Sequence, residues 1–180
     1  MGFVRRSALT REALVQASQG ALNPEQLAGT DLVLTVLALS DVIRTQIYEK
    51  YQAEHGVSEG NIALLMALGR KDAQGVVELA DSMGVKPATV SVMLRRMLND
   101  SPRLVEVRSN PQDARCRTVC LTAQGRKLLE DVLLPGLYGD FESFTSSLSA
   151  PDKEQLIKAL RGLIDPAASA TPRTLQPHGN

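Results

Sequence analysis

Apolar residues recur every three or four positions along most of the chain, a spacing that predicts helices. The pattern is strongest over residues 31–54, where it predicts one long helix. The repeating positions are Leu32, Val36, Leu39, Ile43 and Ile47, with Val33, Leu34 and Leu37 beside them. A last predicted helix follows Ser149 and carries Leu156, Ile157, Leu160 and Ile164. The apolar faces at both ends are wider than one small domain can bury, so both helices need a partner.

Capping residues predict where further helices begin. Asn23 followed by Pro24 is a helix start, and the composition of residues 10–19 adds a short helix before it. Ser58 is the predicted N-cap of a helix that ends near Leu68.

A long helix is predicted over residues 123–144, with Thr122 as its cap and a kink at Pro135-Gly136. The tail after Asp165 has no apolar periodicity and is expected to be disordered.

Residues 76–97 predict two short helices around a tight turn. Gly84 can adopt a positive φ after the first helix, and Pro87 fits the first turn of the second. One face of the second helix is apolar and consists of Val90, Leu94, Met97 and Leu98. The opposite face is polar and basic, so one face packs and the other is free to contact DNA.

Two β-prone runs follow, at residues 104–107 and 117–121. The segment between them, residues 108–115, is predicted to be a loop because Asn110-Pro111 favours a turn. Together they form a hairpin whose basic tip carries Arg108 and Arg115.

The net charge is zero, but it is unevenly distributed. Residues 70–127 contain eleven Lys and Arg against six Asp and Glu, a net charge of about +5, and the remainder carries about −5. This distribution favours a DNA-binding segment on a separate scaffold, although a solvated charged surface would give the same count. Few aromatic residues and no Trp leave no stacking platform for single-stranded nucleic acid.

Several classes of protein are disfavoured. There is no run of 18 apolar residues and no signal peptide, so we expect a cytoplasmic protein without a membrane partner. Cys116 and Cys120 are expected to be free thiols, because four residues of strand separate their Cα atoms by about 13 Å, too far for a mutual disulfide. Two histidines provide no metal cluster, nucleophile triad or phosphate loop, so neither an enzyme nor a cofactor is predicted.

Four motifs in order resemble the MarR family of winged-helix transcription regulators. They are ELA at residues 78–80, ATVS at 88–91, RSNPQDAR at 108–115 and CLTAQGRKLL at 120–129. Ala80, Gly84 and Val90 also stand at the characteristic positions of a helix-turn-helix. The resemblance covers about residues 31–164.

The resemblance implies a homodimer joined by its first and last helices, with a recognition helix in each major groove of a pseudo-palindromic double-stranded DNA operator. It also implies a wing whose arginine, Arg115, enters the minor groove and is braced by Asp113. The DNA-binding residues expected from the pattern and the resemblance are Lys86, Ala88, Thr89, Ser91, Val92, Arg95, Arg96, Arg108, Asp113 and Arg115. Val92 stands where many members have an arginine, and Ala114 replaces a second basic wing residue, so sequence specificity is expected to differ.

Effectors of the family, often aromatic acids, bind between the dimer helices and the DNA lobe. The residues expected to bind such a ligand here are Arg44, Tyr48, Tyr51, His55 and Arg70. Their alternative interpretation is a set of salt bridges and a helix-end histidine.

The sequence thus predicts a mainly α fold of the α+β winged-helix type. It comprises an N-terminal helical extension over residues 1–29, a MarR-type domain over 30–165 and a tail over 166–180. Within the domain, the DNA-binding lobe spans about 57–122, and the dimerisation helices span about 30–55 and 123–165.

The predicted function is a dimeric, sequence-specific transcription regulator, a repressor released by a small ligand. Two alternatives remain open. Val92, Ala114 and the zero net charge favour a protein-interaction module with weak DNA binding. Cys116 or Cys120 would instead serve a thiol-based redox sensor.

Overall fold

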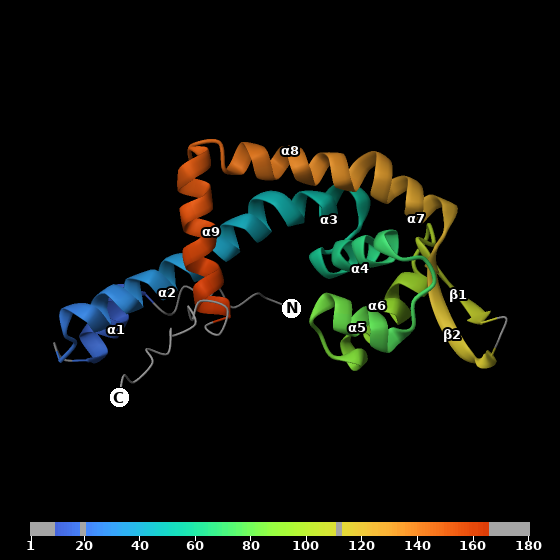
Figure 1. Ribbon diagram of the computed structural model, residues 1–180, viewed down its shortest axis with the longest axis horizontal. Helices are drawn as coiled ribbons and strands as arrows, with labels where there is room; N and C mark the ends of the chain where they lie inside the picture. Colours follow the sequence, from blue (N-terminus) through green and yellow to red (C-terminus); the bar gives the residue numbers. More distant parts are fainter. Residues whose placement is uncertain (1–9, 19–20, 111–112, 166–180) are drawn as a thin grey trace, which may run out of the picture. The chain divides into compact units, whose positions relative to one another are not determined.

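The computed structural model describes residues 10–18, 21–110 and 113–165, which are mainly helical with one two-stranded antiparallel sheet (Figure 1). Two compact units divide the chain, residues 1–135 and residues 136–180. The predicted tail over residues 166–180 lies outside the described residues, as does the beginning of the predicted N-terminal extension, residues 1–9.

One continuous helix of 32 residues, Pro24–His55, runs through the first unit. It consists of α2 (Pro24–Ile43), a π turn (Arg44–Tyr48) and α3 (Glu49–His55). The helix begins at Pro24 rather than near Asp31 because Asn23 and Gln26 form a capping box, each side chain accepting the other's backbone N–H at 2.9 Å. The predicted division between residues 29 and 30 therefore falls inside α2. Before it, α1 (Arg11–Ala17) is capped by the Thr10 side chain and contacts α2.

The apolar side of α2 is uncovered in this unit. Its large exposed side chains are Leu32, Val33, Val36, Leu39 and Val42. By length and composition alone, the helix Pro24–His55 could cross a membrane. The sequence did not predict this, because it contains no unbroken run of 18 apolar residues. Length and composition are weak evidence for a membrane span, because a helix that packs against another protein chain passes the same test.

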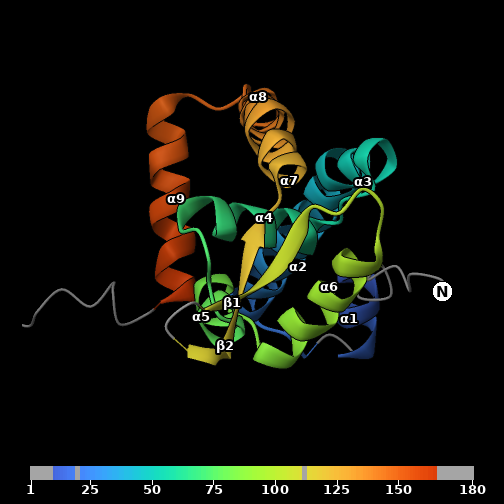
Figure 2. The same ribbon diagram turned by 90° about the vertical axis from the view of Figure 1, so that its right-hand side faces the viewer.

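The DNA-binding lobe predicted over residues 57–122 is built from three helices and a hairpin. The helices are α4 (Glu59–Arg70), α5 (Val76–Met83) and α6 (Pro87–Asn99), and the strands are β1 (Val105–Asn110) and β2 (Asp113–Leu121). α5 contacts both α4 and α6, β1 contacts α6, and β2 contacts α4 (Figure 2). Their shared core includes Ile62, Leu65, Leu68, Leu79, Val90, Leu94, Val105 and Val119. Ser58 caps α4 as predicted, since its Oγ accepts the Asn61 N–H at 3.3 Å.

The hairpin is longer than predicted. Most of residues 108–115, expected to be a loop, is strand: Arg108 pairs with Thr118 and Ser109 with Arg117. The register shifts only between Ser109 and Asn110. Apolar alternation fails to reveal this part because both faces of the protruding strands are polar, so backbone hydrogen bonds alone define it.

A helix follows the hairpin, as predicted, from α7 (Ala123–Leu128) through a π turn (Leu129–Leu133) into α8 (Leu134–Phe144). Thr122 caps it by accepting the Gly125 N–H at 3.0 Å. The helix continues through Pro135, where the sequence predicts a kink, and the irregularity is the π turn just before that proline.

The second unit contains most of α8 and the last helix, α9 (Ala150–Ile164). Ser149 caps α9 as predicted. No residue of α9 is buried, and Leu156, Ile157 and Ile164 are exposed.

Candidate nucleic-acid interface

The local sequence sets the angle between α5 and α6. Gly84 ends α5 with φ of 65°, a left-handed conformation that glycine adopts without a steric penalty. Pro87 then begins α6 at a position where its missing N–H removes no helical hydrogen bond. Val90, Leu94 and Met97 are buried, so this face of α6 packs into the lobe as predicted.

The opposite face of α6 is open to solvent. The predicted DNA-binding residues of this segment are all exposed: Lys86, Ala88, Thr89, Ser91, Val92, Arg95 and Arg96. Arg95 and Arg96 form no ion pair with any of the described residues. Two guanidinium groups are thus available to donate hydrogen bonds to phosphate oxygens or to acceptors on base edges.

The wing presents its predicted residues differently. Arg108 is exposed, but its Nε donates a hydrogen bond to Glu106 Oε1 at 2.8 Å, and the two side chains form an ion pair. This hydrogen bond, and then the charge of Glu106, raises the pKa of Arg108. Asp113 and Arg115 belong to β2 by their backbone, while their side chains lie outside the described part of the structure.

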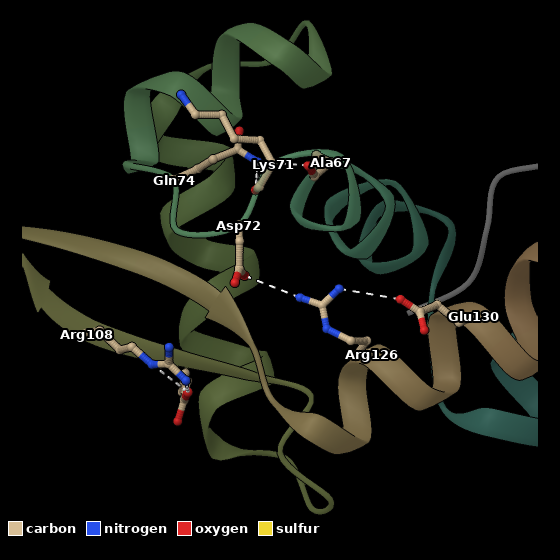
Figure 3. A network of polar contacts seen from close by, with 8 residues as sticks. Ala67, Lys71, Asp72, Gln74, Arg108, Arg126 and Glu130 are labelled. Atoms are coloured by element: carbon tan, nitrogen blue, oxygen red, sulfur yellow. Dashed lines mark hydrogen bonds and ion pairs between the residues drawn. The ribbon is translucent and has the colours of Figure 1, made fainter.

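Gln74, which the sequence did not single out, joins the wing to the helices. Its side chain is buried, and Nε2 donates hydrogen bonds to the carbonyls of Ala67 at 2.8 Å and Lys71 at 2.6 Å (Figure 3). Its backbone forms an isolated bridge with Val119 of β2. In the sequence, Gln74 lies within the polar run KDAQG, which reads as an ordinary connecting loop.

A second contact ties the same loop to α7. The guanidinium of Arg126 lies 3.5 Å from Asp72 Oδ1 and 3.4 Å from Glu130 Oε1 (Figure 3). All three side chains are about half exposed, so these pairs contribute little stability. Ala73 lies between Asp72 and Gln74 and has φ of 59°, which is uncommon for a residue other than glycine. Both of its neighbours form the side-chain contacts described above.

The five predicted ligand-binding residues do not form one site. Arg44 and Tyr48 line a cavity of about 510 Å³, whose other lining residues are Val36, Leu39, Ser40, Ile43 and Glu59. Burial, and then the Glu59 carboxylate, raises the pKa of Tyr48. Arg44 forms an ion pair with Asp41.

The other three predicted residues lie elsewhere. His55 lines a second cavity, of about 760 Å³, where α3, the segment after α6 and α7 meet. Tyr51 is buried in the core and stacks on His55, with 6.3 Å between ring centroids. Arg70 is exposed at the end of α4. Spacings of four and three residues would place Arg44, Tyr48 and Tyr51 on one face of a regular α-helix, but the helix has a π turn at Arg44–Tyr48 and Tyr51 is buried in the core.

A helix-turn-helix followed by a β-hairpin that packs on α4 and α6 defines a winged-helix domain. Residues 57–116 match the model of the MarR family. This segment of the chain is thus similar to the MarR family, and the match spans the helix-turn-helix and most of the wing.

Individual relatives agree with this assignment. The HTH-type transcriptional repressor MdtR of Bacillus subtilis is 29% identical over 104 residues, which cover 58% of this chain and 65% of that repressor. Bordetella bronchiseptica BpsR, whose DNA binding is regulated by 6-hydroxynicotinic acid, superposes with a TM-score of 0.61 at 22% identity, over 74% of this chain and 99% of that one. The MepR–DNA complex of S. aureus superposes with a TM-score of 0.62 at 18% identity, over 73% of this chain and 94% of that one. The structural likenesses establish the fold, and the predicted mainly α winged-helix class is confirmed.

Proposed function

We propose that this protein is a homodimeric, sequence-specific DNA-binding transcription regulator that acts as a repressor. The observation that carries the proposal is the division of α6 into a buried apolar face and an exposed face with Arg95 and Arg96. A helix of this kind fits the major groove, where side chains on its exposed face reach base edges. The relatives support this direction, since MdtR is named as a transcriptional repressor and MepR was solved with DNA.

The uncovered helices support a dimer. Exposed apolar side chains lie on α2 in the first unit and on α9 in the second. A second copy of the chain would remove both surfaces from water, and each buried leucine or isoleucine would contribute about 1.5–3 kcal/mol. A two-fold dimer would present two copies of α6 to a pseudo-palindromic operator with half-sites about 10 bp apart.

A small ligand is proposed to lower operator affinity. The cavity of about 510 Å³ at the π turn combines apolar residues with Arg44 and Tyr48, and it is within the size range of small-molecule sites. Such a lining suits an aromatic acid, whose ring would contact the apolar side chains. The regulation of BpsR by 6-hydroxynicotinic acid supports a ligand of this class.

Fewer observations favour the alternative functions. A protein-interaction module would explain the exposed apolar Val92 on α6, which is 46% exposed. A redox sensor acting through Cys120 is disfavoured because this free thiol is buried on β2. We propose no enzymatic activity and a cytoplasmic location, as expected of a DNA-binding regulator.

The test is selection of genomic DNA by the purified protein, followed by fluorescence anisotropy on the selected and scrambled sequences over a salt series. We expect the selected sequence to bind about a thousandfold or more tightly than the scrambled one. Equal, weak binding to both would favour the interaction module. Titration with 6-hydroxynicotinic acid and benzoate then tests the ligand class, with Arg44→Ala as the variant expected to lose the response.

A further inference from the structure

Val92 lies at the centre of the exposed face of α6. Consecutive residues of an α-helix are turned by about 100°, so Val90 and Leu94, two positions before and after Val92, lie on the opposite side of the helix. These two residues are buried, with exposed fractions of 0% and 5%, whereas Val92 is 46% exposed. The Val92 side chain therefore points away from the core of the lobe.

Polar and small residues flank this valine. By helical spacing, Thr89 and Arg96 lie on one side of it. Ala88 and Arg95 lie on the other side, and all four residues are exposed. Among the residues of α6, all of which the structure describes, Val92 is the only large apolar side chain that is exposed. A protein-docking surface needs a contiguous apolar patch, which a single valine does not provide.

The place of Val92 on the helix determines what it contacts in a DNA complex. When a helix lies in the major groove, the centre of its exposed face is directed towards the floor of the groove, where the base edges lie. Val92 is the sixth residue of α6 and belongs to its N-terminal half, the part of a recognition helix that contacts bases. Its side chain would thus be buried against a base edge.

The chemistry of valine limits which base can lie there. The side chain has neither a hydrogen-bond donor nor an acceptor, so an amino group of cytosine or adenine packed against it would lose its partner, at a cost in free energy. The carbonyl oxygen of guanine would be left unpaired in the same way. The C5 methyl group of thymine is the apolar group that base edges present in the major groove. Val92 therefore favours thymine.

We propose that Val92 contacts the C5 methyl group of a thymine in each half-site of the operator and makes this base a determinant of sequence specificity. The contact favours thymine because it buries apolar surface on both partners. It disfavours the other bases because their polar edges lose hydrogen bonds. This inference rests on the proposed DNA-binding function and specifies one feature of its target sequence.

Replacing thymine by deoxyuridine tests the contact, because it removes the C5 methyl group and keeps the base pair. In the sequence that the wild-type protein selects from genomic DNA, each thymine is replaced in turn in both half-sites. We expect one position to stand out, with affinity lowered by about fourfold for each methyl group, or about fifteenfold for the two half-sites together. Fluorescence anisotropy measures these affinities.

Two valine variants show whether Val92 is the side chain in contact with that methyl group. Val92→Ala removes the two methyl groups of the proposed contact and should bind the thymine and deoxyuridine forms of the operator with nearly equal affinity. Val77→Ala makes the same change on α5, where Val77 is 62% exposed, and should keep the wild-type difference. Thermal melting checks the fold of both variants.

The possible failures are distinguishable. A wild-type protein that binds every deoxyuridine form as tightly as the selected sequence would overturn the proposal. A Val92→Ala protein that keeps the wild-type difference would also overturn it, because another side chain would then contact the methyl group. A wild-type protein that selects no DNA sequence would instead reject the proposed function itself.

Discussion

Gln74 and Val119 are paired through their backbones, with the Gln74 N–H donating to Val119 O at 3.0 Å and the Val119 N–H donating to Gln74 O at 2.8 Å. This bridge joins the segment before α5 to β2, so the helix-turn-helix and the wing are fixed to each other at their bases. The buried Gln74 side chain extends the connection to the last turn of α4.

Replacing Gln74 by leucine should lower the free energy of unfolding by about 1–3 kcal/mol, because a buried carbonyl and a partly buried one lose their donor. Urea denaturation followed by circular dichroism measures this loss. Gln124→Leu is the matched control, since Gln124 is exposed on α7 and should change stability by less than about 0.5 kcal/mol. Equal effects of the two substitutions would mean that the Gln74 side chain contributes no specific support.

Gly125 allows α7 to approach the beginning of the wing. A Cβ at this position would lie 1.9 Å from the backbone oxygen of Leu104, so Gly125→Ala must displace the backbone. We expect a loss of about 1–3 kcal/mol or more in the free energy of unfolding.

Gly29 provides the contrasting case, because a Cβ there meets nothing within 4 Å and the residue lies inside α2. Gly29→Ala should stabilise the protein by about 0.5–1 kcal/mol. Thermal and urea unfolding of both variants give the comparison. A Gly125→Ala protein as stable as wild type would show that α7 and the Leu104 backbone separate easily.

Base recognition by α6 predicts that Arg95→Ala or Arg96→Ala relaxes discrimination at particular base pairs. A lost bidentate contact to a base should cost about 1–3 kcal/mol at that position and leave the others unchanged. Anisotropy with single-base variants of the selected operator measures it. Arg161→Ala, which removes an exposed arginine from α9, is the control. If Arg95→Ala and Arg96→Ala both weaken every sequence equally, these arginines contact only phosphate.

Dimerisation through α9 predicts that Ile157→Glu dissociates the protein. Ile157 is 48% exposed in the single chain, so the substitution should spare the fold of one subunit while placing a charge in the proposed interface. Sedimentation velocity should show a monomer, whereas Lys158→Glu, at the adjacent exposed position, should remain a dimer. A protein that is soluble only with detergent before any substitution would indicate that lipid covers the apolar helices instead.

Much of the fold could be predicted because its determinants are local. Asn23, Ser58, Thr122 and Ser149 are short polar residues placed immediately before apolar helical patterns, and each is an N-cap in the structure. The apolar and polar faces of α6 followed from helical spacing alone. Their proposed contact with DNA stays a prediction.

Other features depend on contacts between distant segments. The extra length of the hairpin arises from backbone pairing between polar residues, and the role of Gln74 arises from its bridge to Val119, far along the chain. The predicted ligand residues do not line one cavity, although Arg44, Tyr48 and Tyr51 are spaced to share a helical face, and the π turn that begins at Arg44 was not evident in the sequence. Tyr51 is buried in the core, while Arg44 and Tyr48 line a cavity.

The long helix Pro24–His55 acts mechanically as a rigid arm with one irregular point. At 1.5 Å per residue, the stretch from Pro24 to the π turn at Arg44 is about 30 Å long. A tilt of about 10° at that turn would displace the far end by roughly 5 Å, which is about one helical turn. The cavity lined by Arg44 and Tyr48 lies at this pivot. A small tilt of the helix caused by a molecule bound there would therefore become a larger displacement at the Pro24 end.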